Sequence, residues 1–229
     1  MAALPHFGVD LTELDTRNIR PITGTELINY GVETLGGGII NLSGPDIFVS
    51  GVTGAGSAEQ LVENNNTGGD LYSYGAGQPV TIACSVVPSF NAPSTSASQV
   101  GISLGSFDGA PVGSAGNVTS YLRLAMSTIT PFWFCGWCQG GGATELLVGA
   151  SGPPVASNLH YRLRIVFDGN TRITWYVNNS VIASIDTGGG SAPNFKANGG
   201  SSGPGIYVQS DAASTMAGRF WGMTVESKP

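Results

Sequence analysis

The sequence predicts an all-β fold, namely a two-sheet antiparallel β-sandwich of the jelly-roll type. Three observations lead to this prediction. Apolar and polar residues alternate with a period of two in many short segments, and helical periodicity is almost absent. The 35 Gly and 13 Pro residues supply turns between these segments. A length of 229 residues is ordinary for one sandwich domain and is sufficient to bury a core.

The first 24 residues differ in pattern from the rest of the chain. They mix charged and apolar residues in an order that fits neither a strand nor a helix, and Pro5 and Pro21 interrupt them. We therefore predict an extended N-terminal arm over residues 1–24 and a β-sandwich domain over residues 25–229. The alternative is a first strand that folds back on its own domain. In the arm model, four apolar side chains would bind a partner: Phe7, Val9, Leu11 and Leu14.

The first strands of the domain are predicted from apolar residues at even positions. Three such sets are Ile82, Cys84 and Val86; Val100, Ile102 and Leu104; and Leu122, Leu124 and Met126. The positions between them, such as Ser85 and Arg123, suit a solvated or lightly covered face. This alternation places Cys84 inside the domain. Upstream, Ser57 and Gln60 resemble a helix capping box before Leu61 and Val62, so this is the one stretch that could be helical, and Asn64-Asn65-Asn66 would end it within two turns.

Residues 160–186 carry the clearest pattern in the chain. Apolar residues alternate over 161–167, 173–177 and 181–185, which predicts three strands with one common apolar face. Asp168-Gly169-Asn170 and Asn178-Asn179 supply residues that tolerate positive φ between these strands. The segment is therefore predicted to be a three-stranded antiparallel meander. Two more strands are expected over 206–208 and 219–225.

The run from Tyr161 to Ile185 resembles the late strands of the concanavalin A-like lectin/glucanase sandwich, in which a strand is followed by a "yvnG" hairpin. Residues 220–225, Phe-Trp-Gly-Met-Thr-Val, resemble the closing strand of that family. This chain has Asn179 where the family usually has Gly, and Asn also tolerates the left-handed conformation. The resemblance implies the fold. It does not imply one function, because the family includes lectins, hydrolases and structural domains.

Composition and charge argue against several classes of partner. The net charge is −6 and the nine Lys and Arg residues are scattered, so we expect no nucleic-acid binding. No apolar run has the length of about 18 residues that a membrane span needs. The first residues lack the pattern of a signal peptide, and we expect the chain to fold in a cytoplasm. Charged residues make up only 10%, which fits either a Ser/Thr/Asn/Gly-rich surface or a surface buried between subunits.

No catalytic constellation is recognised in the sequence. Glycosidases of the resembled family carry a Glu-x-Asp-x-Glu strand, and this chain has no such segment. His160 alternates with Arg162 and Arg164 on a polar face, which favours a solvated residue over a member of a catalytic triad. No ligand set for zinc or calcium is found. We therefore predict that the protein is not an enzyme and has no catalytic residues, metal ligands or cofactor.

Residues 132–138 combine an aromatic cluster with a Cys-x-x-Cys motif. Gly140-Gly141-Gly142 follows it and argues against the helix that a thioredoxin-like site would need, so we interpret Cys135 and Cys138 as semi-buried side chains of a hairpin. The aromatic residues are interpreted as core. Alternatively, Trp133 and Trp137 are exposed and stack on a carbohydrate.

Two functions from different classes agree with these observations. The first is a virion structural protein, namely a bacteriophage capsid decoration (cement) or short fibre protein that docks through its arm, with the virion as its location. It would act as a homo-oligomer, with a trimer favoured, and would bind other virion proteins. The second is a lectin-like carbohydrate-binding module for host attachment, whose partner is a glycan.

We predict that deletion of residues 1–20 yields a soluble domain that melts cooperatively and no longer assembles on its partner. Light scattering and thermal melting provide the measurements. An insoluble or molten product would show that these residues belong to the core.

Overall fold

A computed structural model of the chain describes residues 19–22, 30–34, 39–41, 47–50, 58–63, 79–90, 99–105, 119–126, 131–138, 143–147, 156–186, 205–209 and 216–227. Within these ranges the regular elements are all β-strands, every strand pair is antiparallel, and the strands form two sheets. The prediction of an all-β, two-sheet antiparallel sandwich is confirmed.

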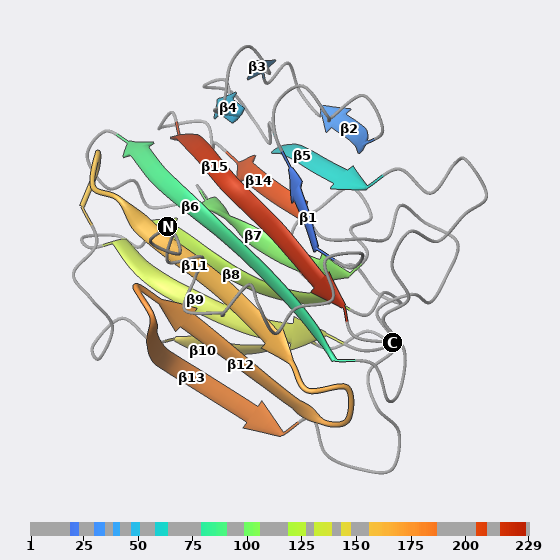
Figure 1. The fold of residues 1–229 in the computed structure, drawn as a ribbon. Coiled ribbons are helices and arrows are strands. Elements are labelled where there is room, and N and C mark those ends of the chain that lie inside the picture. The colour runs from blue at the N-terminus through green and yellow to red at the C-terminus, as the bar shows by residue number, and fades with distance from the viewer. Residues whose placement is uncertain are drawn as a thin grey trace, which may run out of the picture.

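The eight-stranded sheet lies nearer the viewer in Figure 1. Its order is β13-β12-β11-β6-β15-β4-β3, and β1 also pairs with β15. The strands are β1 (Ile19–Ile22), β3 (Ile39–Asn41), β4 (Ile47–Ser50), β6 (Val80–Phe90), β11 (Tyr161–Phe167), β12 (Arg172–Val177), β13 (Ser180–Asp186) and β15 (Met216–Ser227).

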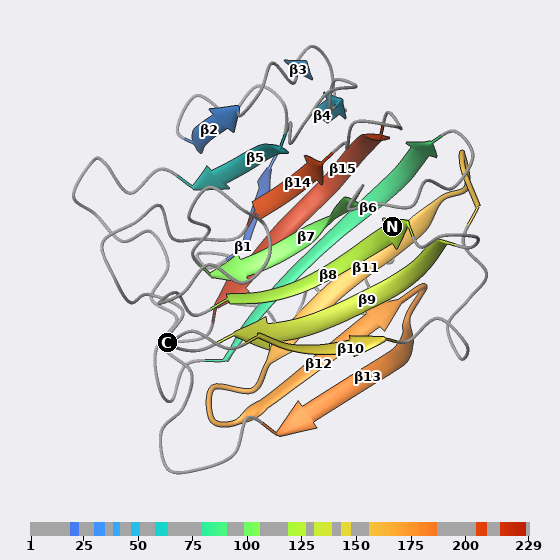
Figure 2. The ribbon, with the colours of Figure 1, turned by 180° about the vertical axis from the view of Figure 1, so that it is seen from behind.

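The seven-stranded sheet forms the second layer and lies nearer the viewer in Figure 2. Its order is β10-β9-β8-β7-β14-β5-β2. The strands are β2 (Tyr30–Thr34), β5 (Ala58–Glu63), β7 (Gln99–Gly105), β8 (Thr119–Met126), β9 (Pro131–Cys138), β10 (Ala143–Leu147) and β14 (Gly205–Gln209). The one stretch that could have been helical is strand β5, because β14 and β2 pair with both of its edges and give its backbone two ladders.

The predicted meander is confirmed as β11, β12 and β13. Asn178 and Asn179 both have positive φ, 51° and 66°, as a two-residue hairpin turn of type I′ requires. The Asn178 side chain also closes the ladder, because its Oδ1 accepts a hydrogen bond from the Arg162 amide at 2.9 Å. In the preceding loop, Asp168 Oδ1 accepts hydrogen bonds from the amides of Asn170 and Arg172, and Gly169 has φ 82°.

The third strand of this meander, β13, contains a β-bulge that the sequence did not predict. Trp175 pairs with Ala183, whereas Tyr176 pairs with Val181, so Ile182 is an extra residue. The bulge moves Val181 to the outer face, where 58% of its surface is exposed. Ala183 and Ile185 keep the inward direction that the sequence predicts. Strict alternation cannot reveal a bulge, because the extra residue changes the face of the residues on one side of it.

A second bulge lies in the middle of β15. Trp221 pairs with Ser85 and Thr224 pairs with Ala83, so two residues of β15 face Cys84 alone. Gly222 takes φ 58° there, in the left-handed region that glycine adopts without strain. The bulge separates two pairings along the same edge of β15, with β4 at 217–220 and with β1 at 223–226.

Strand β1 lies within the predicted N-terminal arm. Its four residues join the eight-stranded sheet, which agrees with the alternative of a strand folded back on the domain for this part of the arm. The four predicted partner-binding residues lie outside the described residues: Phe7, Val9, Leu11 and Leu14. Their role and the 1–24 boundary stay predictions.

The core lies between the two sheets. Each sheet contributes fully buried apolar side chains, including Ile82, Val86, Leu163, Ile165, Ile173 and Phe220 from one and Val100, Ile102, Trp133, Ile206 and Val208 from the other. Trp133 of β9 packs edge-on against Tyr161 of β11, with ring centroids 5.2 Å apart. Burial of each such side chain stabilises the fold by roughly 1.5–3 kcal/mol before conformational entropy is counted.

Gly218 is required by close packing between the sheets. A Cβ atom at this position would lie 2.5 Å from Phe220 Cε2 and 2.8 Å from Val100 Cγ2 of the other sheet. We predict that Gly218→Ala lowers the free energy of unfolding by about 1–3 kcal/mol through overpacking. The melting temperature should fall by about 2–4 °C for each kcal/mol.

The matched control is Gly222, where a Cβ atom would meet nothing within 4 Å but φ is positive. Gly222→Asn should cost less than Gly222→Ala, because Asn tolerates the left-handed region. If Gly218→Ala and Gly222→Asn melted at the wild-type temperature alike, the packing argument for Gly218 would be wrong.

Candidate binding face

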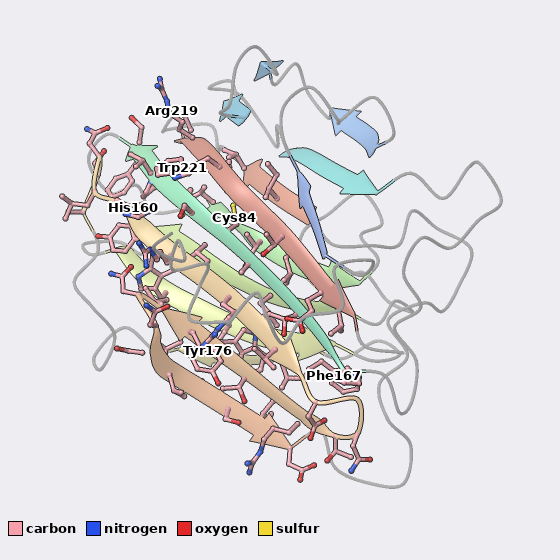
Figure 3. The ribbon with its side chains drawn as sticks, viewed as in Figure 1. Cys84, His160, Phe167, Tyr176, Arg219 and Trp221 are labelled. Atoms are coloured by element: carbon pink, nitrogen blue, oxygen red, sulfur yellow. The ribbon has the colours of Figure 1, made fainter. Side chains whose placement is uncertain are left out.

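The outer face of the eight-stranded sheet carries large polar and aromatic side chains on neighbouring strands. Residues at alternate positions of β6, β11, β12 and β15 point away from the core, because their neighbours in sequence are buried. We define the candidate site as Trp221, His160, Arg162, Arg164 and Tyr176. Figure 3 shows three of these residues, His160, Trp221 and Tyr176, with the side chains of the sheet.

Strand register brings these residues together from distant parts of the chain. Ser85 of β6 pairs with Trp221 on one side and with Arg162 on the other. Arg164 pairs with Tyr176 of β12. Side chains directly opposite each other on one face of a sheet are within contact distance, so the site is continuous over four strands.

Trp221 and His160 form the centre of the site. Their rings stack with centroids 5.1 Å apart and an interplanar angle of 19°, across the intervening strand β6. The outward residues of β6 below them are small. Ala83 and Ser85 are only 1% and 7% exposed although they belong to the outer face. Of the two environments expected for Ser85, solvated or lightly covered, the structure shows the covered one.

Arg164 and Tyr176 form the second contact of the site. The guanidinium carbon of Arg164 lies 3.8 Å from the centroid of the Tyr176 ring, which is a cation–π geometry. Both side chains are half-buried. The contact fixes the plane of the arginine over the phenol ring.

The orientation of Trp221 depends on the bulge that follows it. The buried Cys84 thiol, 3.6 Å from the Trp221 carbonyl oxygen, donates to it where the bulge interrupts the ladder. Burial raises the pKa of the Cys84 thiol, which the bond to Trp221 only partly opposes. The thiol is therefore neutral at physiological pH and able to donate. The predicted burial of Cys84 is confirmed, with 0% of its surface exposed.

The segment before β11 positions His160. The Asn158 amide donates to the Pro88 carbonyl oxygen at 2.8 Å, and the Phe90 amide donates to Ser157 Oγ at 3.0 Å. The Ala156 amide donates to the Tyr161 hydroxyl at 2.8 Å. These bonds tie residues 156–161 to the end of β6, so His160 enters β11 from an anchored loop.

The site is positively charged. Arg162, Arg164 and Arg219 lie on β11 and β15, and His160 becomes a further cation at low pH. Partial burial lowers the pKa of His160 below its ordinary value, and the nearby Arg162 charge lowers it further. The imidazole is therefore neutral at pH 7.

The residues that the sequence singled out for carbohydrate lie elsewhere. Trp133 is 1% exposed and packs in the core, so it cannot stack on a ligand, and its assignment as a carbohydrate-binding residue is corrected. Trp137 belongs to β9, but its side chain lies outside the described residues. Cys135 is buried, and the whole Cys-x-x-Cys motif lies in β9, which confirms that it does not open a helix.

The sequence did not identify Trp221 and Tyr176 as site residues. The alternation over 173–177 placed Tyr176 on the polar face but did not mark it as a binding residue. Trp221 stands beside Phe220, so hydropathy alone does not show which of these two faces outward. In the described part of the chain, no cluster of three His, Cys, Asp or Glu residues could hold a metal ion. No helix long and apolar enough to span a membrane occurs in that part either.

Comparison with known proteins gives structural neighbours only. No family model matches the chain, and no curated protein matches its sequence. The binding domain of botulinum neurotoxin DC in complex with SialylT is 12% identical, with a TM-score of 0.52. The binding domain of Paraclostridial Mosquitocidal Protein 1 is 11% identical, with a TM-score of 0.53.

Both similarities cover 86% of this chain, but this chain spans only 43% and 44% of the two neighbours. At this level of identity the comparison supports the β-sandwich fold alone. Both neighbours are binding domains.

The lowered pKa of His160 predicts a small loss of stability in acid. Below pH 6.5 the unfolded state binds a proton at this position more readily than the folded state, so this contribution is present above pH 6.5 and is lost as the pH falls through the folded pKa. Urea unfolding at pH 7.5 and pH 5 should show a smaller acid-induced loss for His160→Gln than for the wild type. Equal losses would contradict the prediction.

Proposed function

We propose that the chain is a non-enzymatic, lectin-like domain that binds a saccharide on the outer face of its eight-stranded sheet. The observation that carries this proposal is the candidate site, in which a half-buried Trp221 and a half-buried Tyr176 are held among planar polar side chains. The site, and not the fold, supports the function, since sandwiches of this kind serve many purposes.

The chemistry of the site suits a sugar. Trp and Tyr combine a large apolar ring surface with a polar group, which matches a sugar ring that has an apolar C–H face and hydroxyl groups at its edge. Arg162 adds a fixed fork of N–H donors for those hydroxyls. Binding would cost little ordering entropy at Arg164 and His160, because their contacts with Tyr176 and Trp221 already restrict them.

A structural neighbour adds limited support. The botulinum neurotoxin DC domain was solved in complex with SialylT, but this chain matches less than half of that domain. The proposal therefore rests on the residues of this chain and not on the neighbour's ligand.

A structural role in a virion is a second proposal, and the low charge of the chain favours it. Charged residues are only 10% of the sequence, and surfaces buried between subunits are depleted of charge. A capsid decoration or short fibre protein would form a homotrimer and add to particles that lack it. Sedimentation of the purified chain, alone and with such particles, tests this role. A monomer that stays in the supernatant would contradict it.

For the saccharide proposal, we predict that Trp221→Ala lowers affinity for a saccharide found on a glycan array by about fivefold or more. The reason is that stacking on an aromatic ring is worth on the order of 1 kcal/mol or more when desolvated. The melting temperature should also fall, because Trp221 is half-buried and stacks on His160, so affinity is measured well below the melting temperature of the variant, where it is folded.

The control is the buried tryptophan of the other sheet. Trp133→Phe should lower the melting temperature through a cavity and leave affinity unchanged, since Trp133 is 1% exposed. Binding that survives Trp221→Ala, or an array without a single bound saccharide, would overturn the proposed function.

A further inference from the structure

We propose that the saccharide is acidic, and that Arg162 and His160 recognise its negatively charged group beside the ring that stacks on Trp221. This inference rests on the proposed function and specifies the class of its ligand. It follows from three features of the outer face, namely its charge, the position of Arg162, and the groups around His160.

The charge of this face opposes that of the whole protein. The chain has nine Lys and Arg residues against 15 Asp and Glu, yet Arg162 and Arg164 of β11 and Arg219 of β15 all belong to the eight-stranded sheet. The acidic residues near these strands lie toward the other end. Asp168 and Asp186 are at the ends of β11 and β13, and Glu226 is on β15 beyond the bulge. Arg162 and Arg164 lie two residues apart on one face of β11, and like charges at such a separation repel. An anion bound there would relieve the repulsion.

Arg162 is the arginine best placed to hold that anion. It lies across Ser85 from Trp221, whereas Arg164 is stacked on Tyr176 one pair further along the strand. Its backbone is fixed on both sides by Asn178, through bonds of 2.8 and 2.9 Å. Within the described residues, no carboxylate forms an ion pair with its guanidinium. A guanidinium binds a carboxylate through two parallel hydrogen bonds, which gives both affinity and orientation.

His160 makes the site sensitive to pH. Only Tyr161 separates His160 from Arg162, and His160 directly precedes β11. Tyr161 pairs with Val86 of β6, and Arg219 of β15 pairs with the adjacent Val87. Strand β6 presents only Val87 and Ser85 here, and residues 156–159 carry no charge. Among the described residues, the charged group that acts on His160 is Arg162. A bound anion would reverse this field, raise the pKa of His160 and be held more tightly once the imidazole is protonated.

The test is a glycan array in matched pairs, in which each acidic saccharide is printed beside its neutral methyl ester. Trigalacturonate, a hyaluronan tetrasaccharide and sialyllactose cover three kinds of sugar carboxylate. We expect at least one acidic member to bind about tenfold or more tightly than its own ester. This factor corresponds to a charge-assisted hydrogen-bond pair of about 1.5 kcal/mol or more.

Variants then locate the charge contact. Arg162→Gln should abolish the preference for acid over ester, whereas Arg172→Gln should change affinity by no more than about twofold. Arg172 is the matched control, because it lies on the same sheet next to the Asp168 loop and an exposed charge far from the ligand is screened. Affinity for the acidic saccharide should rise as the pH falls from 7.5 to 5, by about tenfold for each unit by which the ligand raises the pKa of His160. His160→Gln should remove this rise.

The outcomes separate the two proposals. If a neutral saccharide or an ester binds as well as the acid, and Trp221→Ala abolishes that binding, the face binds saccharides but the inference about charge is wrong. If the acid preference is present but unaffected by Arg162→Gln, the assignment of the anion contact is also wrong. If no saccharide binds, or if Trp221→Ala leaves binding intact, the proposed function itself fails.

Discussion

Strand β6 must be covered on both faces, and most of the structure depends on this constraint. Its inward residues Ile82, Cys84 and Val86 are completely buried in the core. Its outward residues Ala83 and Ser85 are nearly as buried, at 1% and 7% exposure, and they pair with residues of β11 and β15 on the two sides. The stacked rings of His160 and Trp221 span the strand from both sides. The core and the candidate site are therefore two faces of one strand, separated by the thickness of its backbone.

The two bulges determine which side chains reach the outer face. In β15, the extra residue after Trp221 lets the strand bend and pair with β4 before the bulge and with β1 after it. The same bulge frees the Trp221 carbonyl oxygen from the ladder, and the Cys84 thiol bonds to it from the core side. In β13, the bulge moves Val181 outward at the edge of the sheet. A bulge changes the direction of a side chain without changing the fold, and a binding surface can be shaped in this way.

The outer face of the eight-stranded sheet carries positive charge around the candidate site. The chain as a whole is acidic, but the strands beneath the site carry arginine, and the pKa of His160 is lowered by burial and by Arg162. Stacking on Tyr176 and Trp221 compensates part of this repulsion, because aromatic faces attract cations and planar groups. These contacts restrict the side chains of Arg164 and His160 before any ligand binds. The backbone of Arg162 is held by its hydrogen bond to the Asn178 side chain.

The sequence by itself determined the local elements of this protein. Period-two alternation identified β6, β7, β8, β11 and β12, and the Asn178-Asn179 and Asp168-Gly169-Asn170 turns were predictable because each contains residues that adopt positive φ at low cost. Only the tertiary structure decided which aromatic residues are exposed. Trp133 and Trp221 are chemically identical and both lie in strands rich in aromatic residues, yet one packs on Tyr161 between the sheets and the other on His160 outside them. The physical reason is that strand register and bulges, which depend on partners distant in sequence, assign a residue to a face, and alternation is uninformative where two bulky residues are adjacent.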